Sequence, residues 1–191
     1  MLNREGWLTE LAKCVEPVFA KFYISKKKYR IVCGWPCRGA TGVKRRVVGE
    51  CHSVESSKGG IREIFISPLL DKPLDVAGTV CHELAHVAAG HKAGHKSGFV
   101  KVCRFVGLIK GRPREVMPGN ELNETLNKLI EKLGPYPHIG MQLTVKEVKP
   151  SKDITLECSS CGCKLRITLK WIEEAGVPYC GCGTKMGPRI A

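Results

Sequence analysis

One stretch decides how the rest of the chain is interpreted, and it reads Cys81-His82-Glu83-Leu84-Ala85-His86-Val87-Ala88-Ala89-Gly90-His91-Lys92-Ala93-Gly94-His95. It contains H-E-x-x-H, and because residues four apart share one face of a helix, His82 and His86 can offer two imidazoles to one zinc ion. Glu83 would then lie beside the metal without binding it, where its carboxylate can accept a proton from a water that the metal acidifies. The stretch therefore predicts a helix that carries a zinc site.

The residues around the motif predict that its two histidines face away from the protein core. Asp75 is the expected N-cap of this helix. The helix has an apolar stripe made of Val76, Val80, Leu84 and Val87. Val80 and His82 are about 200° apart around a helix, so the histidines lie roughly opposite the stripe. This placement favours metal binding over a structural role in the core.

A catalytic zinc ion needs a third protein ligand, and two more histidines are candidates. Metzincin spacing would place glycine at position 89 and histidine at position 92, but the chain has Ala89 and Lys92, which excludes that class. His91 would have to turn back immediately after the helix. His95 stands at the end of a glycine-flanked loop that can return to the metal, so the spacing favours His95.

The rest of the first 137 residues indicates an α+β fold, with helices packed on a small sheet. Apolar residues at helical spacing predict three more helices, the first kinked at Pro17, over residues 7–22, 96–109 and 120–133. Short β-like runs separated by turns predict three strands, at 31–33, 47–51 and 63–67. Such short strands, closely spaced, suggest a mostly antiparallel sheet.

The composition changes after a stretch at 138–150 that we interpret as a linker. Residues 151–191 contain C-x-x-C, then an alternating apolar run from Leu165 to Trp171 that predicts a strand, then C-x-C. Two cysteine knuckles around a strand are typical of a zinc ribbon, in which thiolates replace the core that so short a segment lacks. The expected ligands are Cys158, Cys161, Cys180 and Cys182. Cys163 is the substitute if the short second knuckle cannot close.

The charge of the chain points to a polyanionic partner. Lys and Arg number 31 against 18 for Asp and Glu, a formal net charge of +13, and most of the excess lies in residues 1–150. Such an excess favours nucleic acid. The basic clusters at 26–30 and 44–46 are the best candidates for phosphate contacts, although solvated basic surfaces are also common.

The cysteine count and the hydropathy pattern indicate a cytoplasmic protein. No apolar run approaches the roughly 20 residues needed to cross a bilayer, and no export signal precedes the first predicted helix. The 11 cysteines are an odd number and several stand at metal-ligand spacing, so reduced thiols are expected rather than disulfides. Among the others, Cys33, Cys37, Cys51 and His52 form a less favoured candidate for another metal site.

The motifs resemble those of the SprT-like (Spartan-type) zinc metallopeptidase family. The pattern of that family is H-E-x-x-H followed by G-H-G-x-x-F, which matches His82 to His86 and Gly94 to Phe99, with Lys96 in place of the second glycine. Three further segments resemble a phage and bacterial branch of the family that has a terminal zinc ribbon. They are Gly34-Trp35-Pro36, Leu133-Gly134-Pro135-Tyr136-Pro137-His138 and the cysteine-rich segment.

The resemblance implies a minimal zincin-like fold, one catalytic zinc on His82, His86 and His95, and Glu83 as general base. A second, structural zinc would occupy the ribbon. The implied function is a zinc-dependent endopeptidase that acts on proteins bound or crosslinked to DNA. The alternative is a nucleic-acid-binding or transcription-associated zinc protein with little or no peptidase activity. Tyr136 and His138 are candidates for stabilising the oxyanion.

Overall fold

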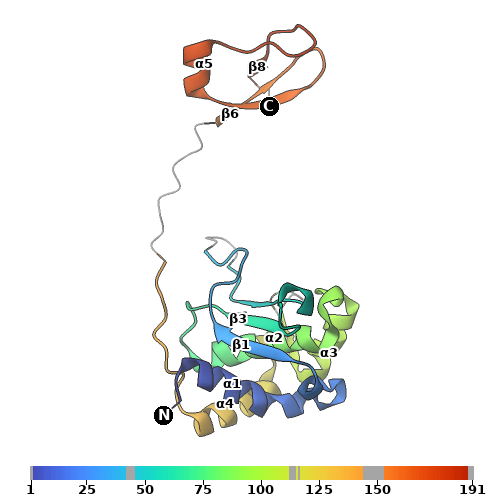
Figure 1. Ribbon diagram of the computed structural model, residues 1–191, viewed down its shortest axis with the longest axis vertical. Coiled ribbons are helices and arrows are strands. Elements are labelled where there is room, and N and C mark those ends of the chain that lie inside the picture. The colour runs from blue at the N-terminus through green and yellow to red at the C-terminus, as the bar shows by residue number, and fades with distance from the viewer. Residues whose placement is uncertain (1, 42–45, 112–114, 116, 144–152, 189–191) are drawn as a thin grey trace. The chain divides into compact units, whose positions relative to one another are not determined.

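The computed structural model describes residues 2–41, 46–111, 115, 117–143 and 153–188 of the 191-residue chain, and it is an α+β protein (Figure 1). The chain divides into two compact units, Met1–Thr144 and Val145–Ala191, each described below by itself. The linker that we expected at 138–150 lies partly outside the described residues, as does the basic cluster at 44–46.

The first unit contains four α-helices among its described residues. Their bounds are α1 Arg4–Val15, α2 Pro73–Ala89, α3 Ser97–Val106 and α4 Asn120–Leu133. Short 3-10 turns lie between them: η1 Glu16–Phe22, η2 Ile24–Lys26, η3 Val54–Ser56 and η4 His91–Ala93. The kink expected at Pro17 is the boundary between α1 and η1, since proline in the first turn of η1 cannot continue an α-helix.

A three-stranded sheet forms the second layer of this unit. Its strands are β1 Tyr29–Cys33, β2 Gly49–Cys51 and β3 Arg62–Ile66, in the order β1-β3-β2. β2 runs antiparallel to β3, but β1 runs parallel to it, so the expectation of a mostly antiparallel sheet is wrong and the sheet is mixed. A two-residue contact between β4 Leu108–Lys110 and β5 Met117–Pro118 follows α3.

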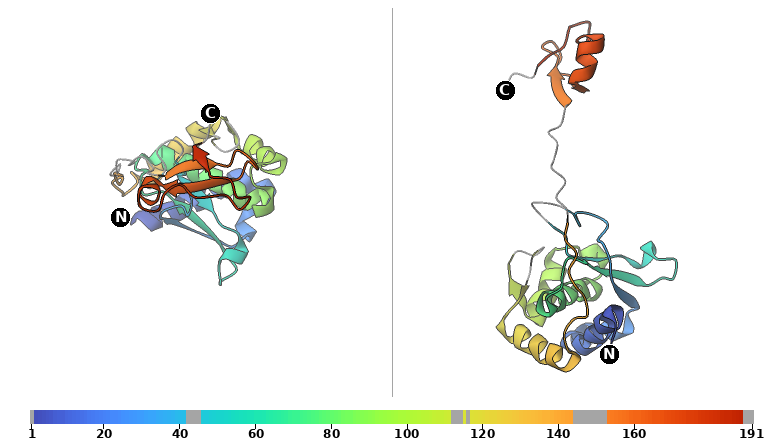
Figure 2. Two further views of the ribbon diagram at one scale, coloured as in Figure 1. Left: turned by 90° about the horizontal axis from the view of Figure 1, so that it is seen from above. Right: turned by 90° about the vertical axis from the view of Figure 1, so that its left-hand side faces the viewer.

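Helices and sheet enclose one hydrophobic core. α1 packs against β1, and α2 packs against β2 and β3 (Figure 2). Ile31, Ile64 and Ile66 of the sheet belong to this core. The apolar stripe predicted for α2 is confirmed, because Val76, Val80, Leu84 and Val87 are fully buried. Burial of four such side chains contributes on the order of 6 to 12 kcal/mol before the entropy of ordering them is subtracted. The orientation of α2 is therefore set by this stripe.

The start of α2 differs from the prediction. The helix begins at Pro73, with Lys72 in the N-cap position, and Asp75 lies inside the first turn. Proline suits the first helical position, since it lacks only an N–H that would be unpaired there, and an acidic residue in the first turn interacts favourably with the helix dipole. Pro73 was thus the stronger signal for the start of the helix.

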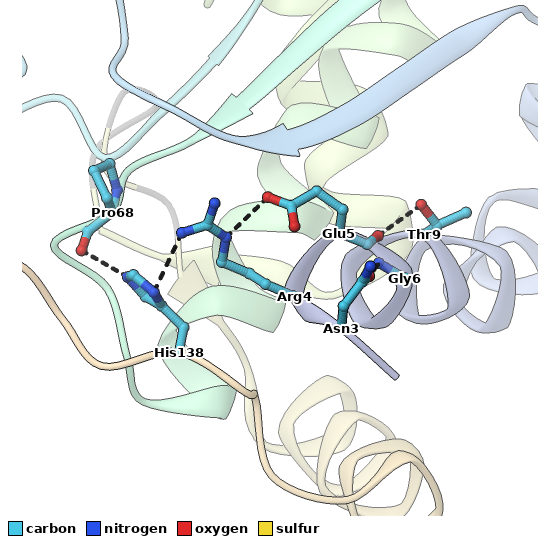
Figure 3. A network of polar contacts seen from close by, with 7 residues as sticks. All are labelled: Asn3, Arg4, Glu5, Gly6, Thr9, Pro68 and His138. Atoms are coloured by element: carbon cyan, nitrogen blue, oxygen red, sulfur yellow. Dashed lines mark hydrogen bonds and ion pairs between the residues drawn. The ribbon is translucent and has the colours of Figure 1, made fainter. Parts of the chain in front are cut away.

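The residues that follow α4 lie against the first unit. Tyr136 is buried with its ring 4.9 Å from that of Trp7, and Met141 donates a backbone hydrogen bond to Pro68. His138 donates from Nε2 to the carbonyl of Pro68 at 2.9 Å, and its Nδ1 lies 3.5 Å from an Arg4 nitrogen (Figure 3). The described part of the expected linker, 138–143, is therefore hydrogen-bonded to the rest of the first unit through His138 and Met141.

The second unit is a small β structure with one short helix. Its elements are β6 Asp153–Glu157, β7 Lys164–Thr168, α5 Leu169–Ala175 and β8 Gly187–Pro188, with β6 between the other two strands. The strand predicted to reach Trp171 ends at Thr168, and Leu169 and Trp171 lie in α5 with about half of their surfaces exposed. Leu156, Cys158 and Met186 form a very small core, and partly buried side chains pack against it.

Among the described residues of either unit, no helix combines the length and the apolar character that crossing a membrane requires.

The C-terminus of α2 gives a test of the fold. Lys27 Nζ donates to the carbonyls of Val87 and Ala88, at 3.0 and 2.8 Å, where a cation satisfies the last carbonyls and the helix dipole. Lys27→Met should therefore lower the free energy of unfolding by about 1 kcal/mol. Urea denaturation measures this loss. Lys28→Met, at the exposed neighbouring side chain, is the control, and equal stability of the two variants would contradict the capping role.

Candidate metal centres

His82 and His86 lie one turn apart on α2, on the side away from its buried stripe. Both are half-buried, whereas Val80, Leu84 and Val87 on the other side are inaccessible. The two imidazole centroids are 5.1 Å apart. The packing of the stripe therefore turns both rings to the same side of α2, as the H-E-x-x-H spacing predicts.

His95 returns to these two histidines after α2 ends. Gly90 and Gly94 both have positive φ angles, 84° and 50°, on either side of η4, and these conformations reverse the chain. The His95 ring lies 4.7 Å from that of His86 and 5.6 Å from that of His82. One ring nitrogen from each of the three falls within 4.8 Å of the others. His91, the other candidate, is exposed at the start of η4 and is not a member of this group.

Phe99, at the first turn of α3, fixes the positions of the three rings. It is fully buried, stacks on His86 at 4.2 Å between centroids, and lies 5.1 and 5.0 Å from His82 and His95. A rigid aromatic wall on one side of three imidazoles limits the rotamers that they can adopt. The phenylalanine of the G-H-x-x-G-F segment is thus a positioning residue for the histidines.

The environment of His86 favours neutral imidazole. Burial, together with the neighbouring His82 and His95, lowers the pKa of His86 to about 3. A neutral ring keeps a lone pair on the nitrogen that is not protonated, which is the form that binds a metal. Three histidines whose ring nitrogens converge on one point can hold zinc and leave one tetrahedral position for water.

Glu83 is buried beside this group but is not part of it. Only 3% of its surface is exposed, and the backbone of β2 lies against its carboxylate at Gly49. Burial raises the pKa of Glu83 to about 8, and the charge of Glu50 contributes in the same direction. A carboxyl group whose pKa lies near neutrality can both take up and release a proton.

Two residues that the sequence suggested for the oxyanion have other contacts. Tyr136 lies against Trp7 and His138, and the ring of His138 bonds to Pro68 and approaches Arg4. Their contacts thus join α1 and the segment after β3. Both residues thus have structural contacts, and their role in stabilising an oxyanion stays a prediction.

The second unit contains a separate cluster of four thiols that can hold a metal ion. The sulfurs of Cys158, Cys161, Cys180 and Cys182 lie within 4.8 Å of one another, with Cys158–Cys182 at 3.5 Å and Cys161–Cys180 at 3.4 Å. All four are free rather than disulfide-bonded. Four thiolates at such separations match a closed tetrahedral site.

The short second knuckle closes because its turn is shortened as well. In the first knuckle, Cys158 donates its N–H to the carbonyl of Cys163, five residues on, and Gly162 has a φ of 69°. In the second, Cys180 donates to Thr184, four residues on, and Gly183 has a φ of 84°. Cys163 therefore contributes a backbone carbonyl to the first knuckle and is not needed as a substitute ligand.

Thr184 also tunes one of the thiols. Its hydroxyl lies 3.5 Å from Cys182 Sγ, and hydrogen bonding with Thr184, followed by that with Cys158 and Cys180, lowers the pKa of Cys182 to about 6. The same hydroxyl lies 2.8 Å from that of Ser160 in the first knuckle. Cys182 is therefore predisposed to the thiolate form that binds metals.

Comparisons of the chain with known protein families, with characterised proteins and with solved structures found no match. What the two clusters do is therefore inferred from their chemistry and geometry.

Gly49 provides a test of the contact between β2 and α2. A Cβ at this position would lie 2.5 Å from Glu83 Oε1 and 2.6 Å from Thr79 Cγ2, so Gly49→Ala must displace the strand or the carboxylate. We expect a loss of about 1–3 kcal/mol in the free energy of unfolding, measured in urea. Gly59→Ala is the control, because its nearest neighbour would be 3.7 Å away. Equal midpoints of urea denaturation for the two variants would show that β2 does not pack tightly against Glu83.

The thiol cluster predicts which cysteine is needed for metal. Cys161→Ser should remove one of four ligands and reduce the metal content of the second unit, whereas Cys163→Ser should leave it unchanged. Elemental analysis of the full chain after dialysis measures both. Metal loss in the Cys163 variant and retention in the Cys161 variant would contradict the ligand set.

Proposed function

We propose that the chain is a zinc-dependent endopeptidase that acts on proteins bound or crosslinked to DNA. The observation that carries the proposal is the convergence of His82, His86 and His95 beside a buried Glu83 that lies outside their group. Three nitrogen ligands and one carboxylate in that relation are the components of metal-assisted peptide hydrolysis. The proposal includes a zincin-like core for the first unit and a zinc ribbon for the second.

The division of labour follows from the positions of the residues. His82, His86 and His95 would hold the zinc ion, which when bound acidifies water and polarises a peptide carbonyl. Glu83 would accept the proton of the attacking water and pass it to the leaving amine. Its burial keeps the carboxylate away from bulk water, and Gly49 leaves room for it. Phe99 would keep the histidines in place during the reaction.

The likeness of the motifs to the SprT-like family supports the same proposal. Glycine and phenylalanine of the G-H-x-x-G-F segment have distinct tasks here, since Gly94 reverses the chain and Phe99 packs against all three rings. Lys96 replaces the usual glycine in an extended conformation that any residue can adopt. That departure therefore leaves the arrangement of His95 intact.

Charge and exposed aromatic groups support DNA as the partner. The net charge is +13, and a groove of about 570 Å³ between α1 and β1 is lined by basic side chains that include Lys13, Lys26 and Lys28. Lys27 caps α2, and Arg30 pairs with Glu63 at 2.8 Å, so Lys26 and Lys28 are the better phosphate contacts. In the second unit, Trp171 is 55% exposed with Lys170 Nζ 5.8 Å from its ring, a combination that suits stacking on unpaired bases.

The experiment compares the zinc-loaded protein with its Glu83→Gln variant on a DNA-binding protein as substrate, with and without DNA. Wild type should cleave the substrate faster when DNA is present. Removal of the general base should lower the rate by about 10²–10⁴-fold while zinc content stays the same. Glu55→Gln, at an exposed carboxylate, is the matched control and should retain the wild-type rate.

Two outcomes would reject the proposal. Equal cleavage by wild type and the Glu83 variant would remove Glu83 from the mechanism. No cleavage by either, together with tight and salt-sensitive DNA binding by both, would identify the alternative, a nucleic-acid-binding zinc protein without peptidase activity.

A further inference from the structure

A third group of metal-ligand side chains lies on the face of the sheet opposite α2. Side chains alternate along a strand, so Gly49 and Cys51 of β2 point towards α2 while Glu50 and the following His52 point away from it. Phe65 of β3, the partner of Glu50 in the sheet, shares this outer face. The sheet therefore separates this group from His82 and His86 of α2.

Cys37 completes the group from the loop that follows β1. Its Sγ lies 3.6 Å from His52 Nε2, and Glu50 Oε2 lies 3.5 Å from the same nitrogen. Ligand atoms of all three residues lie within 4.8 Å of one another. A thiol, an imidazole and a carboxylate therefore surround one small volume.

The convergence on a single nitrogen distinguishes this group from a catalytic triad. In a triad, one imidazole nitrogen faces the nucleophile and the other faces the acid. Here the sulfur and the carboxylate oxygen both face Nε2, which carries either one proton or one lone pair. Nε2 can therefore hydrogen-bond with only one of these two atoms at a time, whereas a cation between the three atoms would bind all of them.

The separations also fit zinc. Bonds of about 2.3 Å to sulfur and 2.0–2.1 Å to nitrogen, at a tetrahedral angle, place those two atoms about 3.6 Å apart. Two bonds of about 2.0–2.1 Å to nitrogen and oxygen place these atoms roughly 3.4 Å apart. The corresponding separations in the structure are 3.6 and 3.5 Å.

Each of the three residues is held in place by the fold. The backbone of His52 donates to Glu63 at 2.8 Å, which continues the pairing of β2 with β3, and its ring lies edge-on to Phe65 at 5.4 Å. Glu50 belongs to β2 and accepts a hydrogen bond from the backbone N–H of Cys37. The site is therefore built from paired strands and one anchored loop.

We propose that Cys37, Glu50 and His52 form a further zinc site, with the fourth position open to water. The ligand set mixes a soft thiolate with imidazole and carboxylate, which suits zinc better than calcium or magnesium. Cys37 is exposed, so the ion can exchange with solvent. Of the four residues in the less favoured sequence prediction, Cys37 and His52 belong to this group, whereas Cys33 and Cys51 pack against the hydrophobic core.

Zinc-dependent protection of Cys37 from alkylation tests the site in the full chain. The protein is treated with iodoacetamide with and without added zinc, and labelling of each cysteine is located by tandem mass spectrometry. Zinc should slow the labelling of Cys37 at least about tenfold, because a metal-bound thiolate is a poor nucleophile towards the reagent. Cys14, an exposed thiol on α1, should be labelled equally under both conditions. Cys81, which is buried, should stay unlabelled in every folded sample.

The variants His52→Gln and Glu50→Gln keep the thiol and remove one ligand each. Both should abolish the protection of Cys37 by zinc while Cys81 stays unlabelled, and neither should change the metal content of the four-cysteine cluster. Equal labelling of wild-type Cys37 with and without zinc would overturn the proposal. So would protection that persists in the His52 variant. Because the readout is the thiol itself, the result is independent of peptidase activity.

Discussion

The burial of the apolar stripe of α2 is the constraint that determines where the functional side chains on the rest of the helix point. Val80, Leu84 and Val87 are locked into the core, and this leaves His82 and His86 only one direction in which to point. β2 closes against the same helix at Gly49, which limits the space available to Glu83. A change that rotated α2 by a few tens of degrees would therefore separate the histidines from His95 and the carboxylate from its place beside them.

Electrostatics then gives each site a different character. Burial keeps His86 neutral and raises the pKa of Glu83 to about 8, so the histidine group can bind a cation beside a base that exchanges protons near neutral pH. In the second unit Cys161 and Cys182 are exposed, and hydrogen bonds with Thr184 rather than burial stabilise the Cys182 thiolate. The first arrangement suits chemistry with an open coordination position, and the second suits a closed structural site.

The sequence was most informative where local periodicity is strong. The bounds of α4, the buried stripe of α2 and the approach of His95 follow from residues close together in the chain. The parallel pairing of β1 with β3 joins distant segments, and no local pattern encodes strand direction. Trp171 fits a strand or a helix equally in so short a run. Nothing in the sequence around Glu50 indicated a metal ligand, because Cys37 comes close to it only through the folding of the loop after β1.

The most direct test of the account is the coordination of zinc at α2. X-ray diffraction from crystals of the zinc-loaded protein, recorded at the zinc absorption edge, locates the ion and its ligands. We predict an anomalous peak about 2.0–2.1 Å from one nitrogen each of His82, His86 and His95, with water as the remaining ligand and Glu83 uncoordinated. A peak bound by Glu83 or by a fourth protein side chain, or the lack of a peak at these histidines, would contradict the account.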